Sequence, residues 1–432
     1  MNSVGKERRQ VNGRAMLQEA LEAGQKALTE AVSSRLNELL MLAVTHLLCR
    51  SFHERRGTIG RWMEQGGRCH RCKSHGVNRF LRNGYRRRWL TTPLGTISFL
   101  LPRVRCACGG SVELPLEGLV RPYQRISDEV DEQIRRWYGM GQSLRQLQSE
   151  LARSTIGPLS LKTLLTRIHQ VAATTPPPGV PPVMQIDAIW VTQLLPNERT
   201  IRDRKGRQRQ AKSRVKRPIF IALGVWPDSG HAIILDWMVG ASEEGDEWLR
   251  FLSRLEEAGI NGEHGLQLVI HDGGSGLCSA LQMVHFDAAT QRCIFHKVRN
   301  IANAIRLPTG LSRRQRTRQR KAILKEFRAI WQAKQLTTAL RRYLKVVRQF
   351  RYTQPEAVAT LRRDFRQTLT FFHFSQDWDA RHLRTTSRLE RFNRSLRRRL
   401  RPAAALHSDQ GLFAMTARII HDFNAQPIST EN

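Results

Sequence analysis

Residues 266–284 read "LQLVIHDGGSGLCSALQMV", and this stretch decides the fold class. Its first part, LQLVIH, is an apolar run that predicts a buried strand, and the part after the glycines predicts a helix. Between them Asp272 is followed by Gly273 and Gly274, so we expect the chain to turn sharply there. The turn leaves a carboxylate at the carboxyl edge of a strand, where sites form in α/β proteins.

The segments around this stretch alternate between the same two kinds of element. Strands are predicted at 183–192, 217–226 and 231–239, a helix at 244–259, and a short strand, RCIFH, at 292–296. That order indicates an α/β domain. From residue 300 to residue 385 the chain reads as arginine-rich helix, and two more helices are predicted at 386–400 and 408–424.

The N-terminal part has a different character. Residues 14–50 carry apolar side chains at helical spacing, and the apolar run at 39–49 is too short to cross a membrane, so we predict a buried helix. The stretch TTPPPGVPP at 174–182 predicts a linker. We therefore predict a helical leader (1–60), a zinc-ribbon-like segment (61–120), a helix-turn-helix (121–173), the linker, an α/β core (183–300 with 386–424) and a helical insertion (301–385).

The charge of the chain points to its class of partner. Among 432 residues, 71 are Lys or Arg and 37 are Asp or Glu, which gives a net charge of +34 and a pI near 11.3. This surplus favours a nucleic-acid partner, because basic side chains that neutralise phosphates release counterions. A solvated basic surface, or a structural protein of the ribosomal type, is the alternative. The N-terminus lacks the apolar core of a secretory signal, so we expect a cytoplasmic protein that has no membrane partner and is associated with the nucleoid when it binds DNA.

Four of the seven cysteines form two tight pairs, Cys69-x2-Cys72 and Cys106-x-Cys108. Two such pairs match one structural Zn²⁺ ion in a zinc ribbon better than a disulfide framework. The second pair is one residue tighter than usual, which leaves His70 or His75 as substitute ligands. Four unliganded buried cysteines are the alternative.

Residues 127–171 contain three helical stretches, each preceded by a serine that can cap it. In a helix-turn-helix the third helix would enter a DNA major groove and present Lys162, Thr163 and Arg167 to it. An ordinary three-helix bundle without DNA contact is the alternative.

Two carboxylates stand out for a physical reason. Asp187 lies inside an apolar strand, where an ionised carboxylate is costly unless a cation or another partner compensates it. Asp272 ends the strand described above. Two carboxylates on neighbouring strands repel each other, so both stay ionised only beside a cation, and oxygen ligands suit Mg²⁺ or Mn²⁺. Each taken alone is also compatible with a cap or turn residue.

A third carboxylate must come from the C-terminal part, which offers Glu326, Glu356, Glu390 and Glu431. Glu390 lies in the basic stretch TTSRLERFNRSLRRRL, which suits a carboxylate held beside DNA. Its alternative role is an ion pair with Arg394, one helical turn away. Asp236, also near a strand end, ranks below these three.

These residues resemble a known family. The block "HDGGSGLCSALQMVHFDAATQRCIFHKVRNI" (271–301) is similar to the region around the second catalytic Asp of the Mutator-like DDE transposases, which include bacterial insertion-sequence relatives. "VMQIDAIWV" resembles their first-Asp strand and "TTSRLERFNRSLRRRLRP" resembles their Glu helix. The resemblance covers residues 183–424 and is weaker in the cysteine segment.

The resemblance implies an RNase H-like catalytic core with a helical insertion and the triad Asp187, Asp272 and Glu390. It implies two Mg²⁺ (or Mn²⁺) ions per active site, one that activates water or a DNA 3′-OH and one that stabilises the leaving oxygen. The partners implied are double-stranded DNA, as element ends and target, and further copies in a homodimer or larger assembly. We also expect His296 beside the carboxylates, and DNA contacts from Lys297, Arg299, Arg394, Arg397 and Arg398.

The long basic connection at 197–218 is interpreted as a DNA-facing hairpin or mobile loop, with a solvated surface loop as the alternative. Three functions fit the sequence. The first is a transposase that cleaves and joins the ends of its element, which an intact triad favours. The second is a domesticated zinc-ribbon and helix-turn-helix regulator without catalysis, and the third is an RNase H-type nuclease.

Overall fold

The computed structural model describes most of the chain: residues 13–48, 68–73, 80–112, 119–121, 123–170, 179–202, 204, 206–400 and 408–425. The chain divides into two compact units. The first comprises residues 1–138 and 143–168, and the second comprises residues 139–142 and 169–432. Of the predicted linker, residues 174–178 lie outside the described residues.

The first unit is built on a long helix and a β-hairpin. Helix α1 (Gly13–Leu48) packs along strand β2 (Gly95–Cys106), which pairs antiparallel with strand β1 (Phe80–Thr92). The C-terminal half of α1 buries Leu40, Val44, Leu47 and Leu48 against the hairpin. The described part of the predicted leader therefore packs on the cysteine-bearing hairpin. Its apolar run is helical and buries one side only, since Leu42 is 52% exposed.

Three short helices complete this unit: α2 (Asp128–Gly139), α3 (Leu144–Arg153) and α4 (Leu161–His169). Ser143 caps α3 in a capping box with Gln146, and the Ser160 hydroxyl accepts the Thr163 N–H at the start of α4. Each helix buries part of its apolar face: Val130 and Ile134 in α2, Leu147 and Leu151 in α3, and Leu164 and Ile168 in α4. These bounds confirm the three predicted helices.

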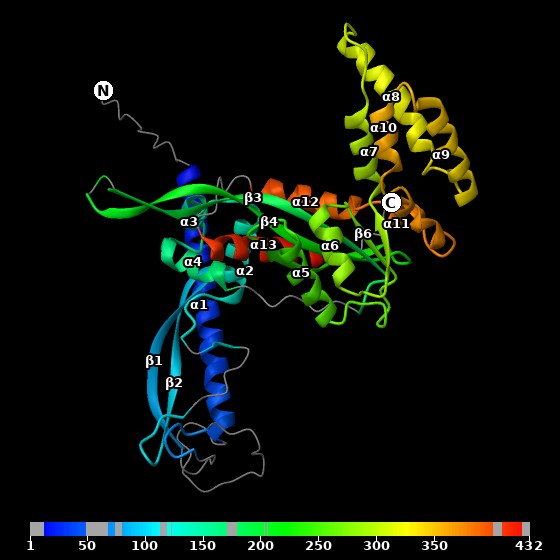
Figure 1. The fold of residues 1–432 in the computed structure, drawn as a ribbon. Helices are drawn as coiled ribbons and strands as arrows, with labels where there is room; N and C mark the ends of the chain where they lie inside the picture. Colours follow the sequence, from blue (N-terminus) through cyan, green and yellow to red (C-terminus); the bar gives the residue numbers. More distant parts are fainter. Residues whose placement is uncertain are drawn as a thin grey trace, which may run out of the picture. The chain divides into compact units, whose positions relative to one another are not determined.

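The second unit contains a five-stranded mixed sheet (Figure 1). Its strands are β3 (Val183–Arg202), β4 (Gln208–Trp226), β5 (His231–Val239), β6 (Leu268–His271) and β7 (Ala289–Arg292). They lie in the order β5-β4-β3-β6-β7, with β5, β4 and β3 antiparallel and β3, β6 and β7 parallel. This confirms the predicted α/β domain.

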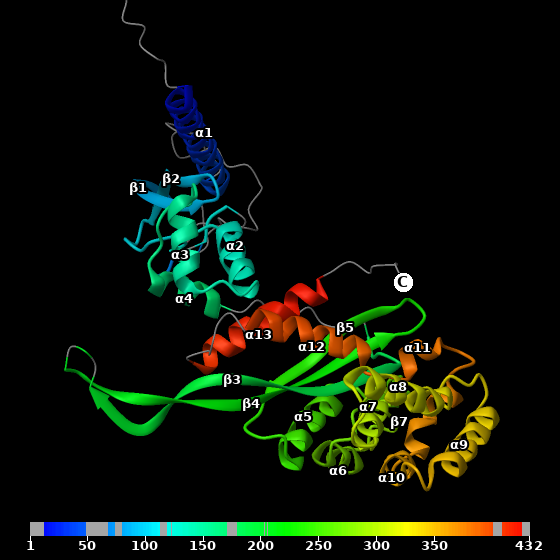
Figure 2. The same cartoon turned by 90° about the horizontal axis from the view of Figure 1, so that it is seen from above.

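Helices cover both faces of the sheet (Figure 2). Helices α5 (Gly245–Glu257) and α6 (Ser275–Met283) lie on one face, where Trp248 packs edge-on against Phe220. Helices α12 (Ser387–Leu400) and α13 (Asp409–Asn424) lie on the other, in contact with β3 and β5 respectively. Because strand side chains alternate, Met184 and Ile186 face α5 and α6, and Asp187 faces α12.

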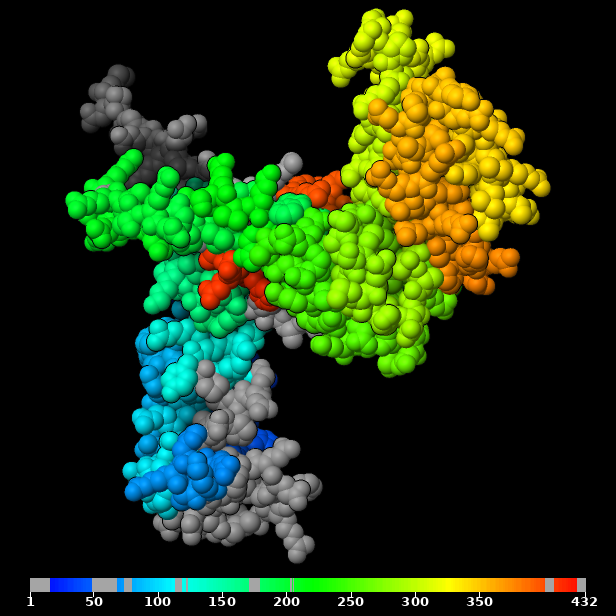
Figure 3. All heavy atoms as spheres, viewed as in Figure 1, coloured from blue at the N-terminus to red at the C-terminus, as the bar shows by residue number. Residues whose placement is uncertain are grey.

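The helical insertion follows β7 and forms a lobe beside the sheet (Figure 3). It comprises α7 (Ile294–Ala304), α8 (Arg313–Ala329), α9 (Leu336–Phe350), α10 (Pro355–Arg362), short 3₁₀ turns and α11 (Ala380–Leu383). Aromatic side chains hold it together, among them Phe327 against Phe350 and Trp331 near Phe365. Two glutamates considered above form ion pairs here, Glu326 with Lys345 and Glu356 with Arg306.

The predicted strand at 292–296 is wrong in its bounds. Strand β7 ends at Arg292, Cys293 occupies the N-cap position, and His296 lies in the first turn of α7. Ile294 donates its N–H to the Arg384 carbonyl outside the sheet. Four side chains at helical spacing are buried instead (Ile294, Lys297, Val298 and Ile301), and Phe295, expected inside, is 50% exposed.

The basic connection between the first two strands of the sheet is a hairpin. β3 and β4 continue their pairing as far as Arg202 opposite Gln208. Beyond the sheet core nearly every described side chain of this ribbon is exposed, on both of its faces. Figure 2 shows the ribbon extending away from the helices that cover the sheet. Among the described helices, none has both the length and the apolar character that crossing a bilayer requires.

Candidate functional site

The two aspartates lie on neighbouring strands, Asp187 within the central strand β3 and Asp272 just after the end of β6. In the parallel pairing of β3 with β6, Ile186 lies opposite His271, so Asp187 and Asp272 are the next residues on neighbouring strands. Asp187 accepts hydrogen bonds from the Ala188 N–H (2.9 Å) and the Asn393 side-chain amide (2.8 Å). Asp272 accepts the Gly274 N–H at 2.9 Å. Both carboxylates are thus oriented by the chain.

The glycine turn after β6 is required by its geometry. Gly273 has φ of +85°, a conformation that side chains rarely adopt. A Cβ at this position would lie 2.5 Å from the Arg292 guanidinium, which fills the space beside the turn and pairs with Asp364. The turn predicted from the sequence is therefore confirmed, and it fixes where the Asp272 carboxylate lies.

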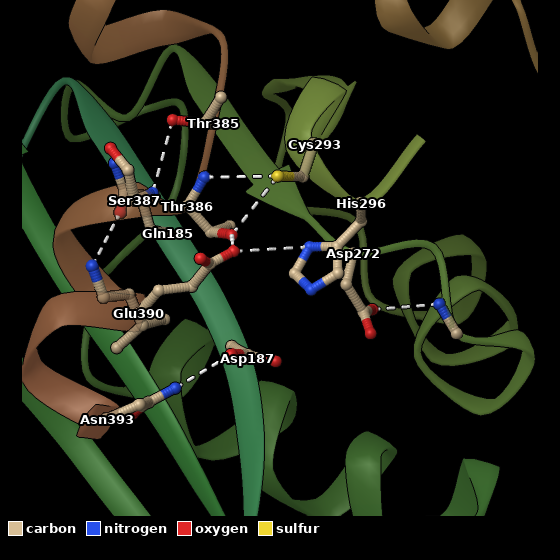
Figure 4. Close-up of polar contacts among 12 residues, drawn as sticks. Gln185, Asp187, Asp272, Cys293, His296, Thr385, Thr386, Ser387, Glu390 and Asn393 are labelled. Carbon is tan, nitrogen blue, oxygen red and sulfur yellow. Dashed lines mark hydrogen bonds and ion pairs between the residues drawn. The ribbon is translucent and has the colours of Figure 1, made fainter. Parts of the chain in front are cut away.

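Glu390 reaches the same region from the first turn of α12 (Figure 4). Its Oε1 lies 3.3 Å from the Thr386 hydroxyl and 3.6 Å from His296 Nδ1. The helix is anchored to the sheet because the Leu389 N–H donates to the Gln185 side chain at 3.2 Å. Glu390 faces this cluster rather than forming the alternative ion pair, and Arg394 is exposed.

A second set of contacts joins the start of α7 to the start of α12. The Cys293 sulfur accepts hydrogen bonds from the Thr386 N–H (3.4 Å) and the Thr386 hydroxyl (3.3 Å). The hydroxyl is thus equally distant from Cys293 Sγ and Glu390 Oε1, and its single hydrogen serves one of them at a time. Thr386 therefore links the Cys293 thiol to the Glu390 carboxylate.

The charges in this region are out of balance. Burial, with the negative charges of Asp272 and Glu390 nearby, raises the pKa of Asp187 to about 7. Burial lowers the pKa of His296, so its imidazole is neutral at neutral pH and supplies no compensating positive charge. Burial and the negative charge of Asp272 also raise the pKa of Glu243. A cation beside these carboxylates would relieve the repulsion.

The donor atoms fit two different kinds of metal. Asp187 and Asp272 offer oxygen atoms only, which suits Mg²⁺ or Mn²⁺. Among the described residues, two groups have ligand atoms that all lie within 4.8 Å of one another. One is the set of four clustered cysteines, and the other is Cys293, His296 and Glu390.

The four cysteines come together at the base of the β1–β2 hairpin. Cys69 Sγ lies 3.5 Å from Cys108 Sγ, and Cys72 Sγ lies 3.8 Å from Cys106 Sγ. Four sulfurs about 2.3 Å from a tetrahedral Zn²⁺ would be about 3.8 Å apart, so the spacing fits that ion. His70 is outside this group, and His75 lies outside the described residues.

The residues predicted to contact DNA fall into two groups. Lys162, Arg299, Arg394, Arg397 and Arg398 have exposed side chains. The other three are engaged within the protein. Lys297 is 2% exposed and its ammonium donates to the Arg363 carbonyl, so the expected DNA contact is wrong for this residue. Arg167 pairs with Asp131 at 3.4 Å, and the Thr163 hydroxyl bonds that of Ser160. Both side chains are half-buried, and their contacts with DNA stay predictions.

Three residues of the site were missed from the sequence. Asn393 lies one helical turn after Glu390, so its spacing alone placed it on the same face of α12. Thr386 lies one turn before Glu390 and carried the same signal. Glu243 bonds the Trp190 indole N–H at 2.8 Å and had no local signal, because it is brought in by the loop before α5. Asp236, the rival carboxylate, forms an ion pair with Arg254 at 2.6 Å.

Comparison with known proteins identifies relatives for most of the chain. Residues 64–170 and 204–426 match the Mutator family of transposases. The transposase for insertion sequence element IS905 of Lactococcus lactis is 22% identical over 79% of this chain and 80% of its own length. The transposase for IS406 of Burkholderia multivorans is 27% identical over 79% and 81%, and that for IS256 in transposon Tn4001 of Staphylococcus aureus is 27% identical over 74% of each. Asp187 lies between the two matched segments, so its assignment depends on the geometry above.

We predict that Thr386→Val lowers the free energy of unfolding by about 1–3 kcal/mol, because Val keeps the shape but leaves the half-buried Glu390 and the buried Cys293 without the hydroxyl. Urea unfolding of the full chain measures this. Thr385→Val is the matched control, because that hydroxyl only accepts the Ser387 N–H in a less buried turn. Equal losses in the two variants would show that the hydroxyl does not support Glu390.

Proposed function

Because the chain belongs to the Mutator family of transposases, we propose that Asp187, Asp272 and Glu390 hold the divalent metal ions for DNA strand cleavage and transfer. The observation that carries this proposal is the placement of Asp187 and Asp272 at adjoining positions of two parallel strands, with Glu390 brought in from α12. The raised pKa of Asp187 supports it, because a buried carboxylate among like charges gains most from a nearby cation.

The architecture of the second unit supports an RNase H-like core. Three antiparallel strands are followed by two parallel ones in the order β5-β4-β3-β6-β7, with helices on both faces. The three carboxylates then come from the central strand, the neighbouring parallel strand and a helix after the insertion. The segment from α7 to α11 corresponds to the helical insertion that the family resemblance implies.

Mg²⁺ or Mn²⁺ bound here would activate the attacking water or DNA 3′-OH and stabilise the leaving oxygen. The protein's own contribution is positioning. Asn393 and the Ala188 N–H orient Asp187, the Gly274 N–H orients Asp272, and Thr386 orients Glu390. His296, neutral and beside Glu390, is placed to contact a bound phosphate or to hold that carboxylate in position.

Two alternative functions remain testable against this one. A domesticated regulator needs no cluster of like-charged carboxylates, and such a cluster destabilises a protein that binds no cation there. An RNase H-type nuclease would share the carboxylates but would cut DNA without joining it. The family match and the additional first unit favour the transposase.

The first unit offers a zinc site and a DNA-contacting surface. We propose that Cys69, Cys72, Cys106 and Cys108 hold one structural Zn²⁺, which the sulfur spacings support. In α4, Lys162 is exposed and available to phosphates.

The second unit exposes four arginines that can contact the DNA backbone. They are Arg299 on α7, and Arg394, Arg397 and Arg398 on the same helix as Glu390, α12.

The β3–β4 ribbon is the other DNA contact that we propose. Lys212, Arg214 and Lys216 alternate along β4, so their side chains share one face of the ribbon, and all three are exposed. A two-stranded ribbon has the width that a major groove admits.

Because a transposase brings two element ends and a target together, we also propose that it acts as a homodimer or larger assembly on DNA.

Loss of any one carboxylate should abolish cleavage. We expect Asp187→Ala, Asp272→Ala and Glu390→Ala each to lower Mg²⁺-dependent cleavage of end-bearing DNA by about 100-fold or more, which corresponds to about 3 kcal/mol of lost stabilisation. Asp236→Ala is the matched control, because it removes a strand carboxylate that is already neutralised by Arg254. If the three variants cleave as well as this control, the assignment is wrong. Joining assays with wild type distinguish a transposase from a nuclease.

The purified full-length chain should retain about one zinc per molecule after dialysis against a weak chelator. Cys72→Ser should lose it, and Cys278→Ser, outside the cluster, should not. Gly110→Ala should also weaken zinc retention, because a Cβ there would lie 2.7 Å from Cys69 Sγ and 3.3 Å from Cys108 Sγ. Elemental analysis decides this, and full zinc retention in Cys72→Ser would contradict the ribbon.

The ribbon's contribution is measurable from salt dependence. Replacing Lys212, Arg214 and Lys216 by Gln should reduce the slope of log affinity against log salt by up to about 3, because each released counterion contributes about 0.9. The matched control is Gln208→Ala with Gln210→Ala, which alters the same face without changing its charge. An unchanged slope in the triple variant would mean that the ribbon does not contact DNA phosphates.

A further inference from the structure

Cys293, His296 and Glu390 form a second ligand cluster that the proposed Mg²⁺ chemistry does not explain. Their Sγ, imidazole nitrogen and carboxylate oxygen all lie within 4.8 Å of one another, and His296 Nδ1 lies 3.6 Å from Glu390 Oε1. Cys293 and His296 are three residues apart at the start of α7, so both side chains reach the same side. Glu390 enters from α12 (Figure 4).

The donor set differs in kind from that of the neighbouring aspartates. One sulfur, one imidazole nitrogen and one carboxylate oxygen suit a borderline ion such as Zn²⁺, which binds Cys, His and Glu in tetrahedral sites. Mg²⁺ prefers oxygen atoms and does not select a thiol or an imidazole. Glu390 is the only member of the cluster that also belongs to the proposed Mg²⁺ site.

The side chains are prepared for such an ion. The buried Nδ1 of His296 makes no hydrogen bond within the described residues, so this nitrogen is available to an ion. The Thr386 N–H donates to Cys293 Sγ, as outer-shell donors do to metal-bound thiolates.

We propose that Cys293, His296 and Glu390 bind a single Zn²⁺ ion and that this ion withdraws Glu390 from the Mg²⁺ site. Zinc at this position blocks DNA cleavage. The binding site stands on its own geometry, and only the inhibitory consequence rests on the proposed function.

Cobalt titration tests the binding site, because a thiolate bound to Co²⁺ gives a charge-transfer band in the near ultraviolet. The full-length protein is dialysed against a weak chelator and titrated with Co²⁺, and the wild-type spectrum is compared with that of Cys293→Ser. Cobalt that enters the four-cysteine cluster cancels in this difference. We expect the difference spectrum to contain a band equivalent to one thiolate per chain. In His296→Ala the affinity for Co²⁺ at this site should weaken at least about tenfold, and in Cys278→Ser the spectrum should match that of wild type. No difference between wild type and Cys293→Ser overturns the site.

A measurement on the wild type alone protects the test against a variant that fails to fold. Equilibrium dialysis should show uptake of a second zinc beyond the one held by the four cysteines, and the absence of a second zinc overturns the proposal. For inhibition, Zn²⁺ added in the presence of excess Mg²⁺ should lower the rate of DNA cleavage by wild type and by Cys278→Ser. In Cys293→Ser, the ratio of the cleavage rate with zinc to the rate without zinc should fall at least about tenfold less. A cobalt band without any Mg²⁺-dependent cleavage refutes the proposed function and leaves the zinc site standing, and cleavage that zinc does not inhibit refutes the inhibition.

Discussion

The constraint on which the second unit depends is a carboxylate placed inside a sheet. Asp187 belongs to an apolar strand, and the alternation of side chains directs it to the face covered by α12. There its charge is costly, because burial and two other carboxylates oppose it. The protein supplies an amide from Asn393 and one backbone N–H, which orient the carboxylate and leave its charge in place. Such an arrangement is stable as an ion-binding site and unfavourable as a simple core.

The site is assembled from segments that are far apart in sequence. Asp187 and Asn393 are 206 residues apart, and Cys293 and Thr386 are 93 residues apart. Hydrogen bonds at three points hold α12 and the segment before it in place: Leu389 to Gln185, Thr386 to Cys293, and Ile294 to Arg384. The helical insertion leaves from α7 and returns to α12, so its two ends are tied together by these contacts. The Cys-x2-His motif at 293–296 thus serves the geometry of Glu390.

Much of the fold and part of the candidate site are predictable from the sequence, and the predictions that are wrong have physical causes. Strand and helix periodicity, the glycines after Asp272 and the paired cysteines are local signals, and the corresponding elements are present. The strand predicted at 292–296 is wrong because, over five positions, a short strand and a buried first helical turn have the same apolar pattern. The predicted DNA contact of Lys297 is wrong because composition does not tell which basic side chain faces inward. The Lys297 ammonium lies inside the protein and donates to a carbonyl. The DNA contact of Arg167, whose partner Asp131 lies two helices earlier, stays a prediction. Asn393 and Thr386 were predictable from helical spacing once Glu390 was chosen.

The two proposals above give Glu390 a role in two chemically distinct ligand sets. In the Mg²⁺ site it would join two aspartates as a third oxygen ligand, and in the zinc site it would add an oxygen to a thiol and an imidazole. Oε1 of Glu390 faces His296 and Thr386, so the carboxylate lies on the side of the imidazole and the thiol. A zinc ion held there would therefore compete with the Mg²⁺ site for this side chain. The Thr386 hydroxyl is 3.3 Å from both the Cys293 sulfur and the Glu390 carboxylate, so the direction of its single hydrogen links the two proposed ligand sets.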